Sequence, residues 1–198
     1  MTELRRRLQA GLQSDPGLGR QDLPQAAVLV AIDEQQAGGA SVILTRRSAQ
    51  LRLHAGEVAF PGGMCDAEDA SHWATAEREA HEEVGMPASS IERSGVMQSM
   101  ITRSGIEVTP CIGRLRHSVQ FVPNPQEIDQ VFQVPLEFLA QAEALHFDSF
   151  DFEGGTRLVP RYDWGEFSIW GITAAILVKL ANIACDAGLT TQDYYQGS

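Results

Sequence analysis

The chain has 198 residues, 43% of them hydrophobic, and a formal net charge of −11. That length suits one domain with a sizeable core, and the negative charge argues against bulk binding of nucleic acid or of an anionic membrane. No segment is apolar over the length that a membrane span requires. The cysteines Cys65, Cys111 and Cys185 have no metal-site spacing, so free thiols in a reducing cytoplasm are expected.

Taken in chain order, the first thirteen residues alternate charged and apolar side chains like a short amphipathic helix. Apolar runs and alternation predict strands over Ala26–Ile32, Val42–Thr45, Val58–Phe60, Ile91–Met100, Glu107–Leu115, Val131–Val134, His146–Phe152 and Arg157–Tyr162. Hairpin turns are expected at residues 102–105 and 153–156, and a proline-broken loop at 119–125. Helices are predicted over Ser71–Val84, Leu136–Ala142 and Ser168–Ala187. The last of these packs through Ile169, Ile172, Ile176, Leu180 and Ile183, and the polar tail after Leu189 is expected to fray.

The helix at residues 71–84 carries glutamates at positions i, i+3 and i+4, namely Glu79, Glu82 and Glu83. They fall within an arc of about 100° on one face, where like charges repel. Carboxylates gathered in this way favour a hard divalent cation, Mg²⁺ or Mn²⁺. The alternative is an ordinary solvated helix face. The Gly62–Gly63 pair before the helix, interpreted as a turn, and a helix-ending Gly85 favour a built site.

A local cluster of basic residues precedes that unit in this acidic chain. The run from Ala40 to Thr45 is followed by Arg46, Arg47, Arg52 and His54. Arginine suits phosphate because its planar guanidinium donates two parallel hydrogen bonds. The charges alone are equally compatible with solvated surface arginines.

Residues 63–86 resemble the Nudix box, whose pattern is G-x5-E-x7-R-E-U-x-E-E-x-G-U with U an aliphatic residue. Every fixed position from Arg78 to Gly85 matches, and Met86 stands at the final U. Gly63 lies fifteen residues before Arg78, one more than the pattern has, and Asp69 stands where the first glutamate would be. We interpret this as one extra residue before the helix, which leaves the role of Asp69 open.

The Nudix resemblance implies an α/β fold, an α/β/α sandwich with a mixed β-sheet between helices, in a single domain over residues 1–198. It also implies a metal site for Mg²⁺ or Mn²⁺. Glu79 and Glu83 would be the principal ligands, Glu82 would share the site, and the Gly63 carbonyl would add an oxygen. Arg78 would orient the carboxylates by ion pairing.

Residues 43–63 look like the motif that precedes the Nudix box in coenzyme A diphosphatases, L-L-T-x-R-S-x3-R-x3-G-x3-F-P-G-G. The matching residues are Leu44, Thr45, Arg47, Ser48, Arg52, Gly56, Phe60, Pro61, Gly62 and Gly63. The resemblance implies hydrolysis of the diphosphate of CoA or acyl-CoA by a monomer or homodimer. The products would be adenosine 3′,5′-bisphosphate and 4′-phosphopantetheine or its acyl form. Arg47, Arg52, Ser48 and Gly62 would contact the substrate.

The general base is not fixed by the resemblance, which allows a carboxylate of the box helix, such as Glu82, or one on a distant loop. Glu127 is the loop candidate, with Asp129 and Glu57 weaker. Three other functions stay open. One is Nudix hydrolysis of ADP-ribose, a nucleoside diphosphate sugar or a dinucleotide polyphosphate. The others are a Nudix-like binding module without turnover, and an interaction protein whose two motifs would be coincidence.

Overall fold

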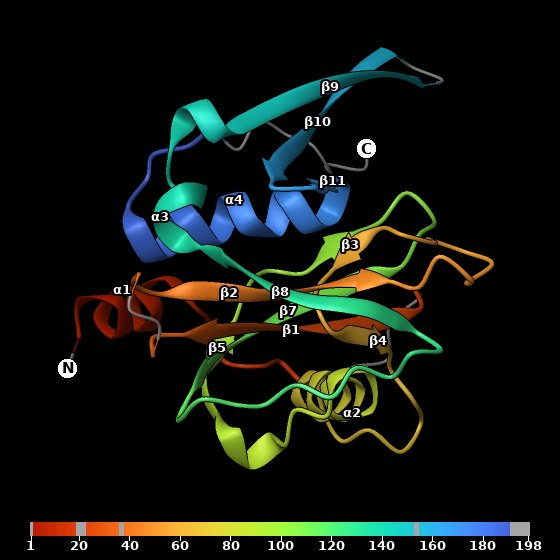
Figure 1. Ribbon diagram of the computed structural model, residues 1–198, viewed down its shortest axis with the longest axis vertical. Helices are drawn as coiled ribbons and strands as arrows, with labels where there is room; N and C mark the ends of the chain where they lie inside the picture. The colour runs from red at the N-terminus through yellow and green to blue at the C-terminus, as the bar shows by residue number, and fades with distance from the viewer. Residues whose placement is uncertain (1, 19–22, 36–37, 153–154, 191–198) are drawn as a thin grey trace.

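The computed structural model describes residues 2–18, 23–35, 38–152 and 155–190. Helix α2 (His72–Val84) covers one face of a mixed β-sheet, and helix α4 (Gly171–Cys185) lies on the other side (Figure 1). Helix α1 (Glu3–Gly11) lies at one end of the sheet and packs against α4. A small second sheet lies beyond α4. The predicted α/β arrangement, a mixed sheet between helices, is therefore confirmed, and the second sheet is an addition to it. None of the described helices has the length and apolarity to cross a bilayer.

The main sheet has the order β3-β2-β1-β7-β5, with β4 also paired to β1, β6 to β7 and β8 to β2. Its strands are β1 (Gln25–Asp33), β2 (Ser41–Arg47), β3 (Val58–Ala59), β4 (Gly62–Met64), β5 (Ile91–Val96), β6 (Met100–Ile101), β7 (Glu107–Leu115) and β8 (Ile128–Pro135). The central pair, β1 and β7, is parallel and buried by helices on both faces.

The Gly62–Gly63 pair does not form the predicted turn. These residues belong to β4, which runs antiparallel to β1 with Gly63 opposite Ala27 and Gly62 opposite Val28. A Cβ on Gly62 would lie 2.5 Å from the backbone oxygen of Ala27. Gly62 is therefore glycine because two strands approach closely, and Gly63 because the Glu79 carboxylate lies against its Cα, not because the chain reverses.

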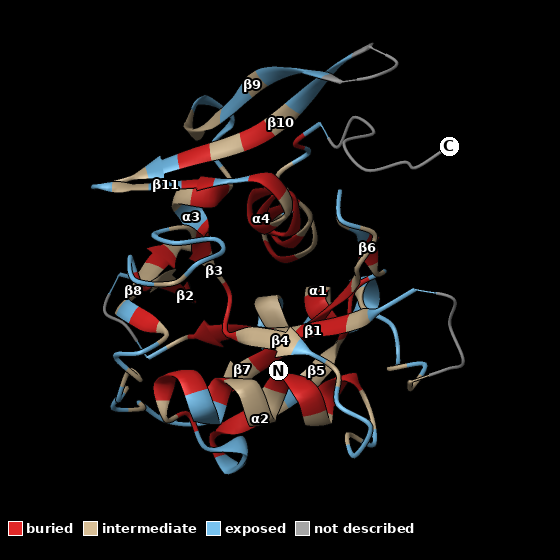
Figure 2. Cartoon of the chain, turned by 90° about the vertical axis from the view of Figure 1, so that its right-hand side faces the viewer, coloured by how far each residue is buried: buried red, intermediate tan, exposed pale blue. Residues whose placement is uncertain are grey.

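Apolar side chains form one core on each face of the main sheet. The apolar face of α2 is buried, with Trp73, Ala76, Ala80 and Val84 packed on the sheet. Ser71 caps this helix by accepting the Ala74 N–H, and Gly85 ends it in the left-handed conformation at φ 68°. The second core lies around α4, which is buried on most of its surface (Figure 2).

The C-terminal part of the chain contains a strand that the sequence did not predict. The small sheet has the order β11-β10-β9, with β9 (Leu145–Phe152), β10 (Gly155–Trp164) and β11 (Phe167–Trp170). The helix predicted to begin at Ser168 begins at Gly171, and Ile169 pairs with Tyr162 across the sheet. The short helix α3 (Leu136–Leu139) and a 3-10 turn (Ala142–Ala144) replace the predicted helix at 136–142.

Two predicted hairpins and the predicted fraying tail have different outcomes. The turn at 102–105 is confirmed by hydrogen bonds from Thr102 N–H to the Ile106 oxygen (2.8 Å) and from Gly105 N–H to the Thr102 oxygen (3.0 Å). The predicted strand at 91–100 is divided into β5 and β6. β9 and β10 pair as expected, but residues 153 and 154 of their turn, and the tail from 191, lie outside the described residues.

Candidate active site

Strand β4 runs beside α2 and brings its glycines against two of the predicted metal ligands. The Gly62 N–H donates to Glu83 Oε2 at 3.1 Å. A Cβ on Gly63 would lie 2.5 Å from the carboxylate carbon of Glu79. Only glycine leaves room for a carboxylate this close to the backbone. The structure therefore places Gly63, Glu79 and Glu83 together, as the sequence predicts.

Arg78 is the centre of a network of ion pairs at the edge of this site. Its Nη1 donates to Glu79 Oε1 at 2.8 Å and to Glu82 Oε2 at 3.3 Å. Its Nη2 donates to the Met64 carbonyl oxygen at 3.2 Å. The side chain of Glu82 is 56% exposed, whereas that of Glu79 is 17% exposed. Arg78 therefore holds two of the three helix carboxylates, as expected for an orienting residue.

Asp69 binds the other side of the Arg78 guanidinium, a role that the sequence left open. It accepts Arg78 Nε at 3.2 Å and Arg78 Nη2 at 2.9 Å, a fork-to-fork pair. The Thr75 hydroxyl donates to Asp69 Oδ2 at 2.8 Å, and the Asp66 N–H donates to the same oxygen at 3.0 Å. The Arg78 hydrogen bonds outweigh burial and lower the pKa of Asp69 to about 2. The extra residue before the helix is thus accommodated without separating Asp69 from Arg78.

Glu83 is the most deeply buried carboxylate of the site, with its side chain only 4% exposed. Burial raises the pKa of Glu83 to about 7, and the charges of Glu79 and Glu127 add to that rise. The hydrogen bond from the Gly62 N–H lowers the pKa of Glu83, and so does the charge of Arg47, whose Nη1 lies 3.8 Å from Glu83 Oε1. Burial also raises the pKa of Glu79, which the Arg78 ion pair only partly offsets. The positive charge near Glu79 and Glu83 therefore does not fully offset the effect of burial on their two carboxylates.

Glu127 reaches the site from the loop before β8, although it is 44 positions beyond Glu83 in the sequence. Its negative charge contributes to the raised pKa values of both Glu79 and Glu83. Asn124 fixes this loop: its N–H donates to the Glu83 carbonyl oxygen at 2.8 Å, and its carbonyl oxygen accepts the Glu127 and Ile128 N–H groups. The Asn124 side chain also donates to Glu127 Oε1 at 3.5 Å. Sequence reasoning missed Asn124, because an asparagine between two prolines looks like ordinary loop.

The arginines of the upstream motif separate onto different faces of β2. Arg47 turns toward Glu83, and its buried Nε has no hydrogen-bond partner. Arg46 turns the other way, over the Phe167 ring at 5.7 Å and 3.8 Å from Glu166. Arg52 is exposed in the bend that follows. Alternation along a strand explains why adjacent arginines cannot serve the same site.

The segment that follows β2 is held by local hydrogen bonds, which involve Ser48 and the two weaker carboxylate candidates, Asp129 and Glu57. Ser48 is buried, its N–H donates to the Glu127 carbonyl oxygen at 2.8 Å, and its hydroxyl accepts the Gln50 N–H. Asp129 accepts the Ala49 N–H at 3.2 Å. Glu57 lies 2.8 Å from the His54 ring nitrogen. Ser48 thus connects the segment after β2, which carries Arg52, to the loop that carries Glu127.

The donors fit a divalent cation by chemical type and charge. Glu79, Glu83 and Glu127 are hard oxygen ligands, the charge of Glu127 raises the pKa values of both Glu79 and Glu83, and the Gly63 backbone lies against Glu79. Within the described ranges, however, no three acidic, histidine or cysteine side chains are already arranged to hold a metal ion. Glu79 is turned instead onto Arg78.

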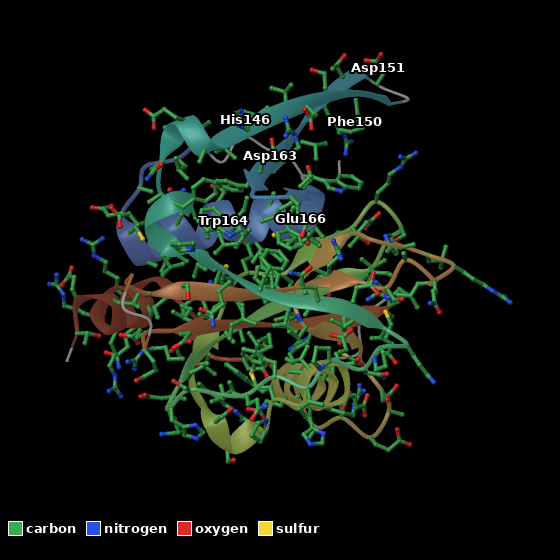
Figure 3. All side chains as sticks on the ribbon, in the orientation of Figure 1. His146, Phe150, Asp151, Asp163, Trp164 and Glu166 are labelled. Carbon is green, nitrogen blue, oxygen red and sulfur yellow. The ribbon has the colours of Figure 1, made fainter. Side chains whose placement is uncertain are left out.

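A second gathering of acidic and histidine side chains lies in the small C-terminal sheet. Figure 3 shows His146 and Asp163 on the far side of the main sheet from α2, with Glu166 nearer the sheet, where it contacts Arg46. Arg161 contacts Asp148 and Asp163 there. These side chains belong to a different layer and take no part in the glutamate site.

Comparison with known proteins places the chain in a family. The model of the NUDIX domain matches residues 23–152. Nudix hydrolase 15, mitochondrial, from Arabidopsis thaliana is 35% identical over 180 residues, covering 88% of this chain and 62% of that protein. An uncharacterized Nudix hydrolase, NudL, from Pectobacterium atrosepticum is 41% identical over 160 residues, covering 79% of this chain and 81% of that protein.

The fold agrees with the sequence comparison. The crystal structure of a MutT/nudix family protein from Enterococcus faecalis matches with a TM-score of 0.57 at 13% identity, covering 85% of this chain and 64% of that chain. The chain is therefore a protein of the mixed α/β fold. It belongs to the Nudix hydrolase family. It spans less than two thirds of the length of the Arabidopsis relative.

Proposed function

We propose that this protein hydrolyses the diphosphate bond of coenzyme A or of an acyl-CoA. The observation that supports hydrolysis is that Gly62 and Gly63 bring the backbone against the buried carboxylate of Glu83 and the partly buried carboxylate of Glu79. Binding of a diphosphate there requires positive charge beside the carboxylates. Arg47, from the CoA-type motif, lies at Glu83 with an unpaired Nε, which supports the assignment of the substrate.

The side chains divide the reaction between holding the diphosphate and moving a proton. Glu79 and Glu83, with Glu82 and the Gly63 carbonyl, would hold Mg²⁺ or Mn²⁺, which when bound neutralises diphosphate charge and favours ionisation of a water. Arg47 and Arg52 would contact the substrate's phosphates. Glu127, held by Asn124 above the helix carboxylates, would accept the proton of the attacking water, with Glu82 as the alternative base. Water adds to one phosphorus, and the bridging P–O bond breaks.

The products identify the substrate and the position of the cut. Purified protein is incubated with CoA and Mg²⁺ or Mn²⁺, with ADP-ribose in parallel, and products are identified by mass. We expect adenosine 3′,5′-bisphosphate and 4′-phosphopantetheine from CoA, only when metal is present. Cleavage of ADP-ribose alone would keep the glutamate site and reject the CoA assignment. Saturable binding of CoA and metal without product would favour a binding module.

A further inference from the structure

A hollow of about 520 Å³ lies beside strand β4, and its lining includes Met64 and Asp69, which both contact Arg78. Its apolar lining comes from Leu18, Leu23, Pro24, Met64 and Ala67. The volume falls within the range of about 300–1,000 Å³ that is common for small-molecule sites. Met64 and Leu23 leave large apolar side chains exposed there, at 44% and 37%. These two side chains offer apolar surface that an apolar part of a ligand could cover.

The hollow continues the site because β4 and α2 stay in contact along their length. Proceeding from the C-terminal to the N-terminal end of α2, Glu83 meets Gly62 and Glu79 meets Gly63. One step further, Arg78 meets the Met64 carbonyl. Met64 therefore belongs both to the Arg78 network and to the lining of the hollow.

The charge of the surrounding side chains differs between the two ends of the line of contacts that runs along β4 from Gly62 to Met64. The described residues that line the hollow include two carboxylates, Asp66 and Asp69, and no cation. Both carboxylates are paired with Arg78, at 3.4 and 2.9 Å. At the other end the Arg47 guanidinium lies 3.8 Å from Glu83. A phosphate in the hollow would face carboxylates, whereas a neutral chain would bury apolar surface.

We propose that the hollow binds the pantetheine arm of the substrate, with or without its acyl group, while the phosphorylated adenosine lies toward Arg47. The inference rests on the proposed function and assigns a direction to the substrate. The diphosphate sits at Glu79 and Glu83, and its two arms leave along α2 in opposite directions. The neutral arm, made of amides and methylenes, occupies the apolar side.

Cys65 reports directly on this arrangement because its half-buried free thiol lines the hollow. The full-length protein is treated with N-ethylmaleimide in the presence of Ca²⁺, a divalent cation that carboxylate oxygens can hold, and modification of each cysteine is followed by peptide mass spectrometry. S-methyl-CoA, which has no thiol, and adenosine 3′,5′-bisphosphate are the two probes, with binding of each measured by calorimetry. Cys185, half-buried on α4, is the internal control.

We expect S-methyl-CoA at ten times its dissociation constant to slow Cys65 modification by about elevenfold, since only the unoccupied fraction reacts. Modification of Cys185 should not change. Protection of Cys65 by saturating adenosine 3′,5′-bisphosphate would reverse the arms and overturn the proposal. Bound S-methyl-CoA without protection would overturn it too, and leave the proposed function intact. Failure of S-methyl-CoA to bind would instead reject the proposed function.

A pair of variants tests the same assignment during turnover. Ala67 is exposed and lines the hollow, and Ala70 is exposed on the same loop but is not part of the lining. Ala67→Trp should raise KM for CoA by about tenfold, equivalent to 1.4 kcal/mol. Ala70→Trp should leave KM within about twofold. Equal KM values for the two variants would contradict a substrate arm in the hollow.

Discussion

Replacing Asp69 by Asn should destabilise the protein by about 2 kcal/mol at pH 7. The Asp69 side chain is 7% exposed and makes two hydrogen bonds to Arg78. Lowering its pKa from 3.8 to about 2 means that folding favours the ionised form by roughly 2 kcal/mol. Asparagine keeps the shape and can still accept from Thr75, but it loses the ion pair. The variant should also reduce turnover, because Arg78 would no longer be fixed beside Glu79.

Urea unfolding of wild type and Asp69→Asn in EDTA, at a series of pH values, tests this reasoning. The pKa of Asp69 is lower in the folded state, so its stabilisation is complete above about pH 4 and is lost as the pH falls toward 2. The difference between the two proteins should therefore shrink between pH 4 and the lowest pH at which both remain folded. Thr75→Val, which removes only a neutral donor, is the matched control. A difference that is zero at pH 7, or that does not change with pH, would refute the argument.

Three other substitutions give distinct outcomes. Glu83→Gln should lower kcat by about 100-fold or more while the fold persists, and full activity would exclude a metal-ligand role. In EDTA, wild type should lose stability as the pH rises from about 5 to 8, because the pKa of Glu83 is raised to about 7 from 4.5, and thermal unfolding of Glu83→Gln should lack this loss. Asn124→Ala should lower kcat by about tenfold with little change in KM. The double variant with Glu127→Gln should have the same kcat as Glu127→Gln alone, because Asn124 acts by positioning Glu127. Additive losses would mean that the two residues act independently. Arg52→Ala should lower kcat/KM for CoA by about tenfold and that for a simpler diphosphate less, and an equal loss would make Arg52 structural.

Much of the fold was predictable because local pattern and tertiary burial agree. The apolar run at 26–32 is the central strand of the main sheet, and the period of apolar residues on α2 matches its buried face. Termination of α2 at Gly85 also follows from residue type. Each of these sequence patterns is local, because it lies within one helical turn or one strand of the residues whose structure it predicts.

The C-terminal strand shows where local pattern is ambiguous. Ile169 is three residues before Ile172, so it fits a helical face, and it also alternates with exposed Ser168 and Trp170, so it fits a strand. Pairing with Tyr162 decides between the two, and that partner depends on the β9–β10 hairpin. The glycine pair at 62–63 was misassigned for a similar reason, since the approach of β1 is a tertiary contact.

The predicted site residues meet in the structure only in part. Gly62, Gly63, Glu79, Glu83 and Arg78 come together as their motif implies, and Glu127 reaches them through a loop contact that the sequence only suggested. The partner of Arg78 was hidden because the spacing between it and Asp69 departs from the pattern by one residue. Distance in the folded chain, not the count along it, decides whether an ion pair forms.

The hydrogen-bond donors of Arg78 are divided between Asp69 on one side and the helix glutamates on the other. Nε and Nη2 bind Asp69, whereas Nη1 is shared between Glu79 and Glu82. A cation bound by Glu79 would compete only for the partners of Nη1, and the two bonds to Asp69 would keep the guanidinium at the edge of the site. Asp69 holds Arg78 in this way although it is one methylene shorter than glutamate and lies nine positions, not eight, before the arginine. The departures from the Nudix pattern in length and in residue type therefore leave Arg78 anchored.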